Sequence, residues 1–110
     1  THQQLDEFCS KYASRLNYDS KILLKAYDRA ITINPNYAAA WNNKGYVLDE
    51  LQMHVEAIET YNKARLIFES INKSEYATII EIVIKKSASK LLKKDCTNMS
   101  IDEILKEIKG

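Results

Sequence analysis

The amino-acid sequence predicts an all-α fold built from repeated helical hairpins. The 110 residues include only 2 Gly and 1 Pro, which is too few for the many turns of a β-sandwich or barrel. Hydrophobic residues make up 45% and charged residues 28%, a balance that suits one small domain with a core. The most specific observation is a pattern of apolar residues at helical spacing that occurs twice, 34 residues apart.

The repeated pattern places small and bulky residues at fixed positions on one side of a helix. Its first copy comprises Leu23, Tyr27, Ala30 and Ile33, and Pro35 follows it. Its second copy comprises Ala57, Tyr61, Ala64 and Ile67. We expect the small residues to let a neighbouring helix come close and the tyrosines to fill the larger gaps between helices.

The helix expected to pair with the second copy of the pattern comes just before it in the sequence. Trp41, Lys44, Gly45 and Leu48 share one side of this helix by their spacing. Glycine within a helix costs about 1 kcal/mol relative to alanine, so Gly45 indicates a contact that a side chain would block. The segment from Leu51 to His54 is expected to form the short turn between the two helices, with His54 in a structural role.

These residues resemble the tetratricopeptide repeat family, whose 34-residue unit carries Trp-x2-Leu-Gly-x2-Tyr, then Ala-x3-Phe-x2-Ala, then Pro. The residues at matching positions are Trp41, Gly45, Ala57, Tyr61 and Ala64. The residues that depart from the pattern are Lys44, Leu48 and Glu69. The resemblance spans roughly residues 19–70 and implies an α-α superhelix, a right-handed solenoid of hairpins. The first helix of each pair would line a concave groove that binds peptide segments of partner proteins.

Both ends of the chain follow the pattern less closely. Leu5, Phe8, Cys9 and Tyr12 keep the spacing of a first helix if a longer turn occupies residues 16–20. The same first-helix spacing recurs at Tyr76, Ile79, Ile80 and Val83. We expect the helix that contains these residues to run to about Lys94. Because Thr78–Ile84 is rich in β-branched residues, a strand there is the alternative.

The sequence therefore predicts about two repeats, a capping helix and a short last helix. Repeat one occupies residues 1–35, repeat two residues 36–70, and the third or capping helix residues 71–94 of one helical array. Residues 95–110 form a loop, with Cys96 partly exposed, and a helix from Ile101 to Lys109. Ser100 and Glu103 have the spacing of a capping box at the start of that helix.

The residues expected to face the groove lie between the buried positions of each first helix. From the helix expected at residues 71–94 they include Ala77, Thr78, Ile84 and Lys85. Those predicted to contact a partner are Asp6, Glu7, Asn42, Asn43, Tyr46, Asp49, Glu50 and Glu81. Five of these are acidic, so we expect a partner peptide with Lys or Arg and an apolar or aromatic anchor. Asn43 could hold a peptide backbone through its amide, and Tyr46 could stack on a side chain.

Composition and motifs argue against most other functions. The chain has no Gly-rich loop, no nucleophile beside a base and no His/Cys cluster with ligand spacing, so we expect no enzyme activity, cofactor, metal or small-molecule substrate. A net charge of +1 gives no general attraction to nucleic acid. No apolar run reaches the roughly 18 residues of a membrane span. Two distant cysteines, Cys9 and Cys96, favour a reduced, cytoplasmic setting.

Two alternatives to a scaffold or adaptor stay open at this point. The first is a homodimer formed through the apolar sides of the third and last helices. The second is nucleic-acid binding through a lysine strip, although residues 73–110 carry only 8 basic against 6 acidic side chains. The strip comprises Lys85, Lys86, Lys90, Lys93 and Lys94. The chain could also be part of a longer repeat array.

Overall fold

The computed structural model describes the backbone of residues 2–109 and the side chains of residues 18–109. Over this range the chain forms α1 (His2–Ile33), α2 (Ala38–Glu50), α3 (His54–Ser70), α4 (Ser74–Leu92) and α5 (Ile101–Lys109). No strand occurs among residues 2–109, so the all-α prediction is confirmed. The alternative of a strand at Thr78–Ile84 is wrong, because the segment lies within α4.

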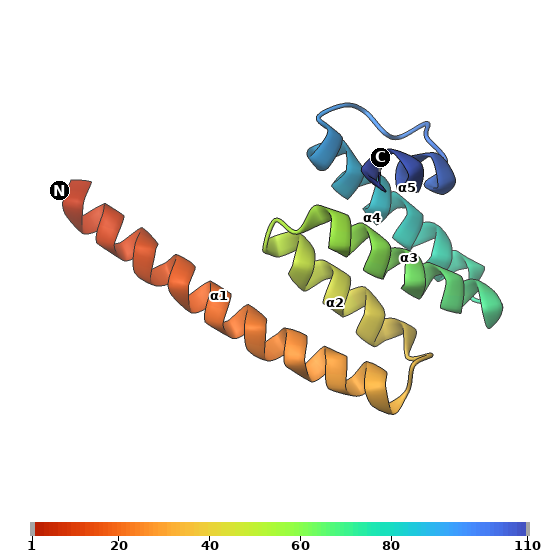
Figure 1. Cartoon of the computed structure of the whole chain (residues 1–110), viewed down its shortest axis with the longest axis horizontal. Helices are drawn as coiled ribbons and strands as arrows, with labels where there is room; N and C mark the ends of the chain where they lie inside the picture. Colours follow the sequence, from red (N-terminus) through yellow and green to blue (C-terminus); the bar gives the residue numbers. More distant parts are fainter. Residues whose placement is uncertain (1, 110) are drawn as a thin grey trace.

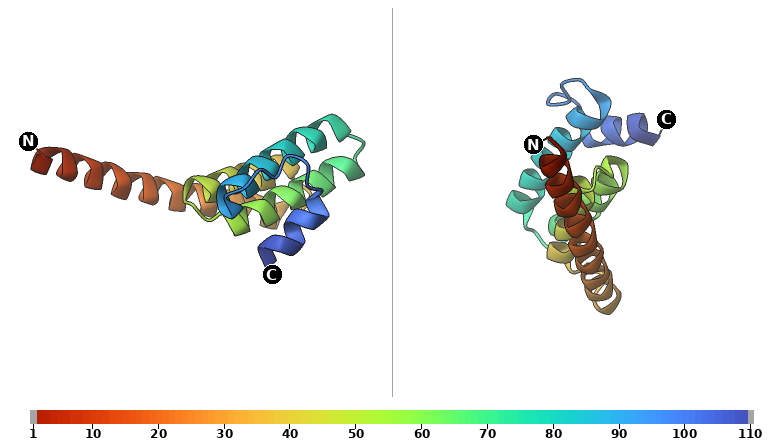
Figure 2. Two further views of the ribbon diagram at one scale, coloured as in Figure 1. Left: turned by 90° about the horizontal axis from the view of Figure 1, so that it is seen from above. Right: turned by 90° about the vertical axis from the view of Figure 1, so that its left-hand side faces the viewer.

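The first four helices lie side by side in chain order, each packed on the next (Figure 1). α5 lies across the end of this row and contacts both α3 and α4 (Figure 2). The hairpin expected from the repeat is the pair of α2 and α3, joined by the predicted turn after Glu50. No helix in the described part of the chain is both long enough and apolar enough to cross a bilayer.

α1 is one continuous helix of 32 residues, so the turn predicted at residues 16–20 is wrong. Residues 16–20 contain neither Gly nor Pro, and nothing in them forces a helix to end. The connections after α2 and α3 also lack Gly and Pro, but each contains a residue in the left-handed conformation. Gln52 and Asn72 each take a left-handed conformation, with φ of 64° and 62°, and reverse the chain within a few residues. Lys93, with φ 56°, ends α4 in the same way.

The core of the hairpin is formed by the small and bulky residues of the repeated pattern. Ala57, Tyr61 and Ala64 of α3 are buried, and Leu48 of α2 packs in the same cluster. A Cβ atom added at Gly45 would lie 2.7 Å from Cδ1 of Tyr61. This distance leaves no room for a side chain, so the predicted close contact at Gly45 is confirmed.

α5 closes the core at the C-terminal end. Ile101 and Ile104 join the same cluster as Ile80, Ile84 and Ala88 of α4. The capping box is formed as predicted, because Glu103 N–H donates to Ser100 Oγ at 3.1 Å and Ser100 N–H donates to Glu103 Oε1 at 3.4 Å. The expectation that Cys96 is partly exposed is wrong. Its side chain is fully buried in this cluster, and its N–H donates to Ser89 Oγ at 3.1 Å.

Candidate interaction surface

The exposed side of α2 carries a row of three side chains that are free of the core. Asn43, Tyr46 and Glu50 are exposed, and spacings of three and four place them next to one another. Tyr46 is 60% exposed, a high value for an aromatic side chain on a helix that is buried along its other side. We call these three residues the α2 face. Its tyrosine offers an apolar ring, its asparagine an amide, and its glutamate a negative charge.

Asn42 and Asp49 border the α2 face and are half-buried. Asp49 has structural partners: Ser87 Oγ of α4 donates to its Oδ1 at 2.7 Å, and His54 Nδ1 lies 2.5 Å from the same oxygen. The Ser87 bond ties α2 to α4 across the side of α3. The His54 bond fixes the turn between α2 and α3 and supports the structural role predicted for His54.

Tyr61 lies beneath the α2 face. Burial is the main cause that raises the pKa of the Tyr61 phenol well above its ordinary value, and the nearby groups of Asp49, Tyr46 and Glu50 raise it further. The same acidic side chains that border or belong to the α2 face therefore act electrostatically on the core residue below it.

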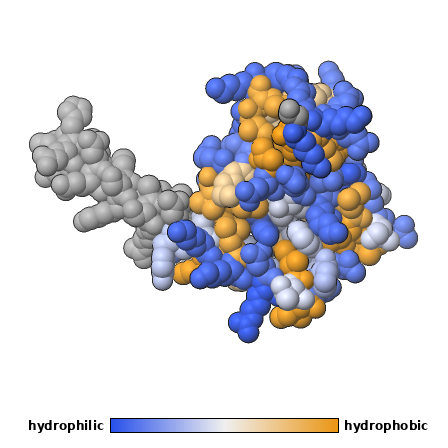
Figure 3. All heavy atoms as spheres, in the orientation of Figure 1, coloured by the Kyte–Doolittle hydropathy of each residue, from blue (hydrophilic) through white to orange (hydrophobic). Residues whose placement is uncertain are grey.

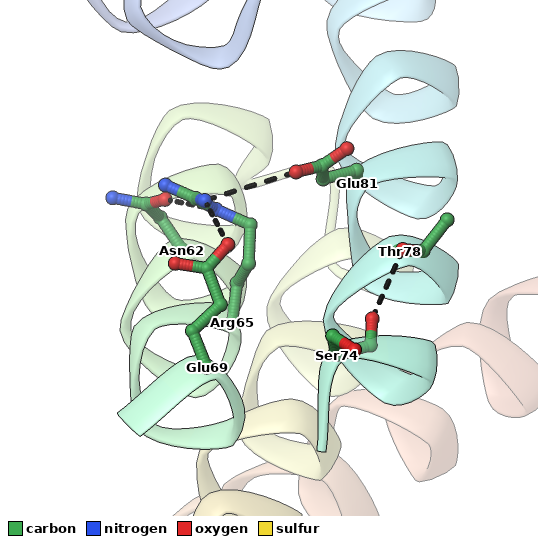
Figure 4. Close-up of polar contacts among 6 residues, drawn as sticks. All are labelled: Asn62, Arg65, Glu69, Ser74, Thr78 and Glu81. Atoms are coloured by element: carbon green, nitrogen blue, oxygen red, sulfur yellow. Dashed lines mark hydrogen bonds and ion pairs between the residues drawn. The ribbon is translucent and has the colours of Figure 1, made fainter. Parts of the chain in front are cut away.

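Glu81 does not join the α2 face. Its Oε1 lies 3.8 Å from Nη1 of Arg65 on α3, and Arg65 also pairs with Glu69 at 2.9 Å. Figure 4 shows Glu81 pointing from α4 toward this arginine, which is held by Asn62 as well. A cavity of about 240 Å³ lies here, lined by residues of α3, α4 and the start of α5.

The register predicted for α4 is wrong by about one position. Ala77 and Ile84 were expected in the groove but are buried. Ile84 packs in the same core cluster as Ile80 of α4 and Ile104 of α5. Ile79 was expected in the core but is 57% exposed. Thr78 is exposed and Lys85 half-buried, and Figure 4 shows Thr78 bonded to Ser74 of its own helix, its Oγ1 donating to the carbonyl at 2.9 Å.

The remaining predicted residues divide into two groups. The side chains of Asp6 and Glu7, like that of Cys9, lie outside the described residues. The lysine strip of α4 is exposed in part, and Lys94 at its end forms an ion pair with Glu107 of α5. The acidic residues expected in one groove are therefore not all brought together in the described part of the chain. That the predicted groove is acidic stays a prediction.

Sequence reasoning missed Arg65 and Ser87, which connect neighbouring helices. Their partners, Glu81 and Asp49, lie 16 and 38 residues away, and no local pattern pairs residues at such separations. The exposed apolar side of α4, formed by Tyr76, Ile79 and Ile82, was also missed. In Figure 3 apolar residues form separate patches on the face shown, each bordered by hydrophilic side chains.

Comparison with family models identifies the segment around α2. Residues 26–59, which run from the second half of α1 through α2 into α3, match the family model described as tetratricopeptide repeat. This segment is a tetratricopeptide repeat. The resemblance drawn from Trp41, Gly45 and Ala57 is thereby confirmed, and with it a helical repeat fold. Searches of curated proteins and of solved structures gave no match.

The tetratricopeptide repeat indicates a protein–protein interaction module, and the family is generally non-catalytic. Within residues 18–109, no three His, Cys, Asp or Glu side chains gather in a way that could hold a metal ion. The α2 face is the part of the predicted set that the fold leaves exposed on one helix.

Proposed function

We propose that this chain is a non-catalytic scaffold or adaptor module that binds a basic peptide segment of a partner protein on the α2 face. The observation that carries the proposal is the exposed row of Asn43, Tyr46 and Glu50 on a helix of a tetratricopeptide repeat. Such a row can recognise a peptide in three ways at once. The amide of Asn43 can hydrogen-bond the peptide backbone, the ring of Tyr46 can contact an apolar anchor, and the carboxylate of Glu50 can attract Lys or Arg.

The charge around the α2 face supports a basic partner. Glu50 is exposed, and Asp49 beside it raises the pKa of the Tyr61 phenol together with Glu50. One cation, Lys44, lies on another side of α2 and pairs with Asp28 of α1 at 2.6 Å. The carboxylate of Glu50 is therefore the acidic group that the α2 face leaves exposed to an incoming basic side chain.

Binding to peptide pools tests this proposal. A basic pool with aromatic or aliphatic anchors is expected to bind with a Kd on the order of micromolar, which is about −8 kcal/mol. Tyr46→Ala and Glu50→Lys should each weaken that binding at least tenfold. The matched control is Glu59→Lys, the same charge change at an exposed position of α3, which should leave binding unchanged. Preference for an acidic pool, or equal losses from both lysine variants, would show that the α2 face is not the site.

A homodimer formed through the C-terminal helices is the second candidate. It is favoured by the exposed apolar side of α4, where Tyr76, Ile79 and Ile82 lie in the open. Ile79→Glu would abolish such a dimer without disturbing the core. Light scattering of the Ile79→Glu variant beside the unmodified chain separates this candidate from a monomeric adaptor.

A further inference from the structure

One side of α1 lies open where the same side of α3 is buried. The four positions of the repeated pattern allow a direct comparison, because each residue of α3 lies 34 positions after its counterpart in α1. Leu23 is 43% exposed, whereas Ala57 is 0% exposed; Ile33 is 79% exposed, whereas Ile67 is 6% exposed. Tyr27 and Ala30 are half-buried, whereas Tyr61 and Ala64 are buried. We call this side of α1, from Leu23 to Ile33, the open face.

In the hairpin, this face of α3 is covered by α2. The contact is closest at Gly45, which has no room for a side chain beside the Tyr61 ring. The pattern of the covering helix also occurs once more in the sequence. Leu5, Phe8, Cys9 and Tyr12 each lie 36 positions before Trp41, Lys44, Gly45 and Leu48. The residues that should cover the open face are thus present, in the first half of α1.

These residues cannot cover the open face of their own helix. α1 is continuous from His2 to Ile33, so Cys9 and Tyr27 are separated by 18 residues of one helix, about 27 Å along its axis. Figure 1 shows α1 running past the end of α2 toward an N-terminus that lies far from the other helices. Residues 5–12 can therefore reach an open face only on another copy of the chain.

We propose that the chain forms a homodimer in which the two α1 helices pair antiparallel, each supplying residues 5–12 to the open face of the other. By the Gly45–Tyr61 contact, Cys9 of one copy lies beside Tyr27 of the second. The midpoint between these two positions is residue 18, which is also the middle of a helix that runs from 2 to 33. The pairing is therefore symmetric and covers both helices along their whole length, as a closed two-fold interface requires.

This dimer differs from the one considered above and does not use the α2 face. It leaves Asn43, Tyr46 and Glu50 exposed, because they lie on the side of α2 away from its buried residues. Its failure and the failure of peptide binding can therefore be told apart.

A disulfide crosslink tests the geometry. Tyr27→Cys, made in a Cys96→Ser background, introduces one new thiol next to the position expected for Cys9 of the other copy. Mild oxidation should then give a covalent dimer on a non-reducing gel. The matched control is Arg29→Cys, an exposed position on another side of α1, which should crosslink far less. A disulfide formed within a single chain, between Cys9 and the thiol introduced at position 27, would mean that residues 5–12 fold back onto their own open face, and would overturn the proposal.

The mass of the unmodified chain tests the proposal independently of any variant. Light scattering is expected to give twice 12.7 kDa, with a shift to the monomer on dilution. Leu23→Glu should yield the monomer with its helix content retained, whereas Ile79→Glu should leave the dimer intact. A monomer at every concentration, or a dimer lost with Ile79→Glu and kept with Leu23→Glu, rejects the pairing of α1 helices.

Discussion

Gly45 lies against the ring of Tyr61, and this contact determines how closely α2 and α3 approach. Glycine is a poor helix residue, so an alanine at an open helical position normally stabilises. At position 45 the added Cβ would lie 2.7 Å from the ring carbon Cδ1, within the core. The steric cost at this one residue therefore opposes the ordinary helix preference.

We expect Gly45→Leu to destabilise the fold by about 1–3 kcal/mol, because the two helices must move apart. Gly45→Ala should lower the melting temperature as well, against the gain of about 1 kcal/mol from helix propensity. Asn43→Ala, an exposed change on the same helix, is the control and should stay within about 0.5 kcal/mol. A Gly45→Ala variant that melts above the parent would contradict the contact.

Ionisation of the Tyr61 phenol should make the free energy of unfolding depend on pH in the alkaline range. Its pKa is raised in the folded chain, chiefly by burial, so the folded state binds the phenolic proton more tightly than the unfolded state does. That contribution is complete below about pH 10, the ordinary tyrosine pKa, and is lost as the pH rises above it. Melting temperatures measured between about pH 9 and pH 11 should fall more steeply for the parent than for Tyr61→Phe. Equal slopes would argue against this assignment.

At the scale of the elements, the ends of the helices explain what the sequence could predict. The turn between α2 and α3 and the start of α5 were expected from the sequence, the latter because Ser100 and Glu103 have the spacing of a capping box. The continuity of α1 was not expected, because residues 16–20 are polar and turn-like in composition. Composition alone does not end a helix. At Gln52 and Asn72 a residue in the left-handed conformation follows the end of the helix. Neither residue is a glycine, so the sequence does not mark these two positions.

The capping box decides whether α5 is stable, since a helix of nine residues is marginal alone. Ser100→Ala removes the acceptor for the Glu103 N–H and should cost about 0.5–2 kcal/mol. Hydrogen exchange of the α5 amides should accelerate, with smaller changes in α2 and α3. Lys106→Ala, at an exposed position of the same helix, serves as the control. Unchanged exchange in α5 after Ser100→Ala would mean that packing alone holds it.

The bond between Ser87 and Asp49 couples α2 to α4, the two helices that flank α3. A double-mutant cycle with Ser87→Ala and Asp49→Ala should give a coupling of about 0.5–3 kcal/mol in urea unfolding. The cycle is needed because Asp49 also contacts His54. Ser87→Ala combined with Glu50→Ala should be additive, since no bond joins that pair. Additivity in both cycles would show that the bond between Ser87 and Asp49 does not couple α2 to α4.

Across the whole molecule, the exposed side of α2 was predicted better than the exposed side of α4. The repeat pattern fixes the core side of α2 through Trp41, Gly45 and Leu48, so the exposure of Asn43 and Tyr46 followed from it. On α4 the position that corresponds to Gly45 holds the bulky Ile80, and two helices, α3 and α5, pack against α4. The choice between Ile79 and Ile80 as core residues therefore could not be made from spacing alone.

If α1 pairs with a second copy, folding and association are linked. The melting temperature of the unmodified chain should rise with protein concentration, by mass action on the dimer. The Leu23→Glu variant should melt at one temperature whatever its concentration. Calorimetry at two protein concentrations tenfold apart is sufficient. A melting temperature of the unmodified chain that is the same at both concentrations would contradict the link between folding and association.

Trp41 is the only tryptophan of the chain, and its surroundings make it a built-in optical probe. Its indole N–H donates to the Pro35 carbonyl at 2.8 Å, and the ammonium groups of Lys44 and Lys63 each lie 5.9 Å from the ring centre. Fluorescence will thus report on the junction of α1, α2 and α3 and remain blind to fraying of α5. Emission and far-ultraviolet dichroism recorded together can separate the loosening of the C-terminal end from the collapse of the repeat itself.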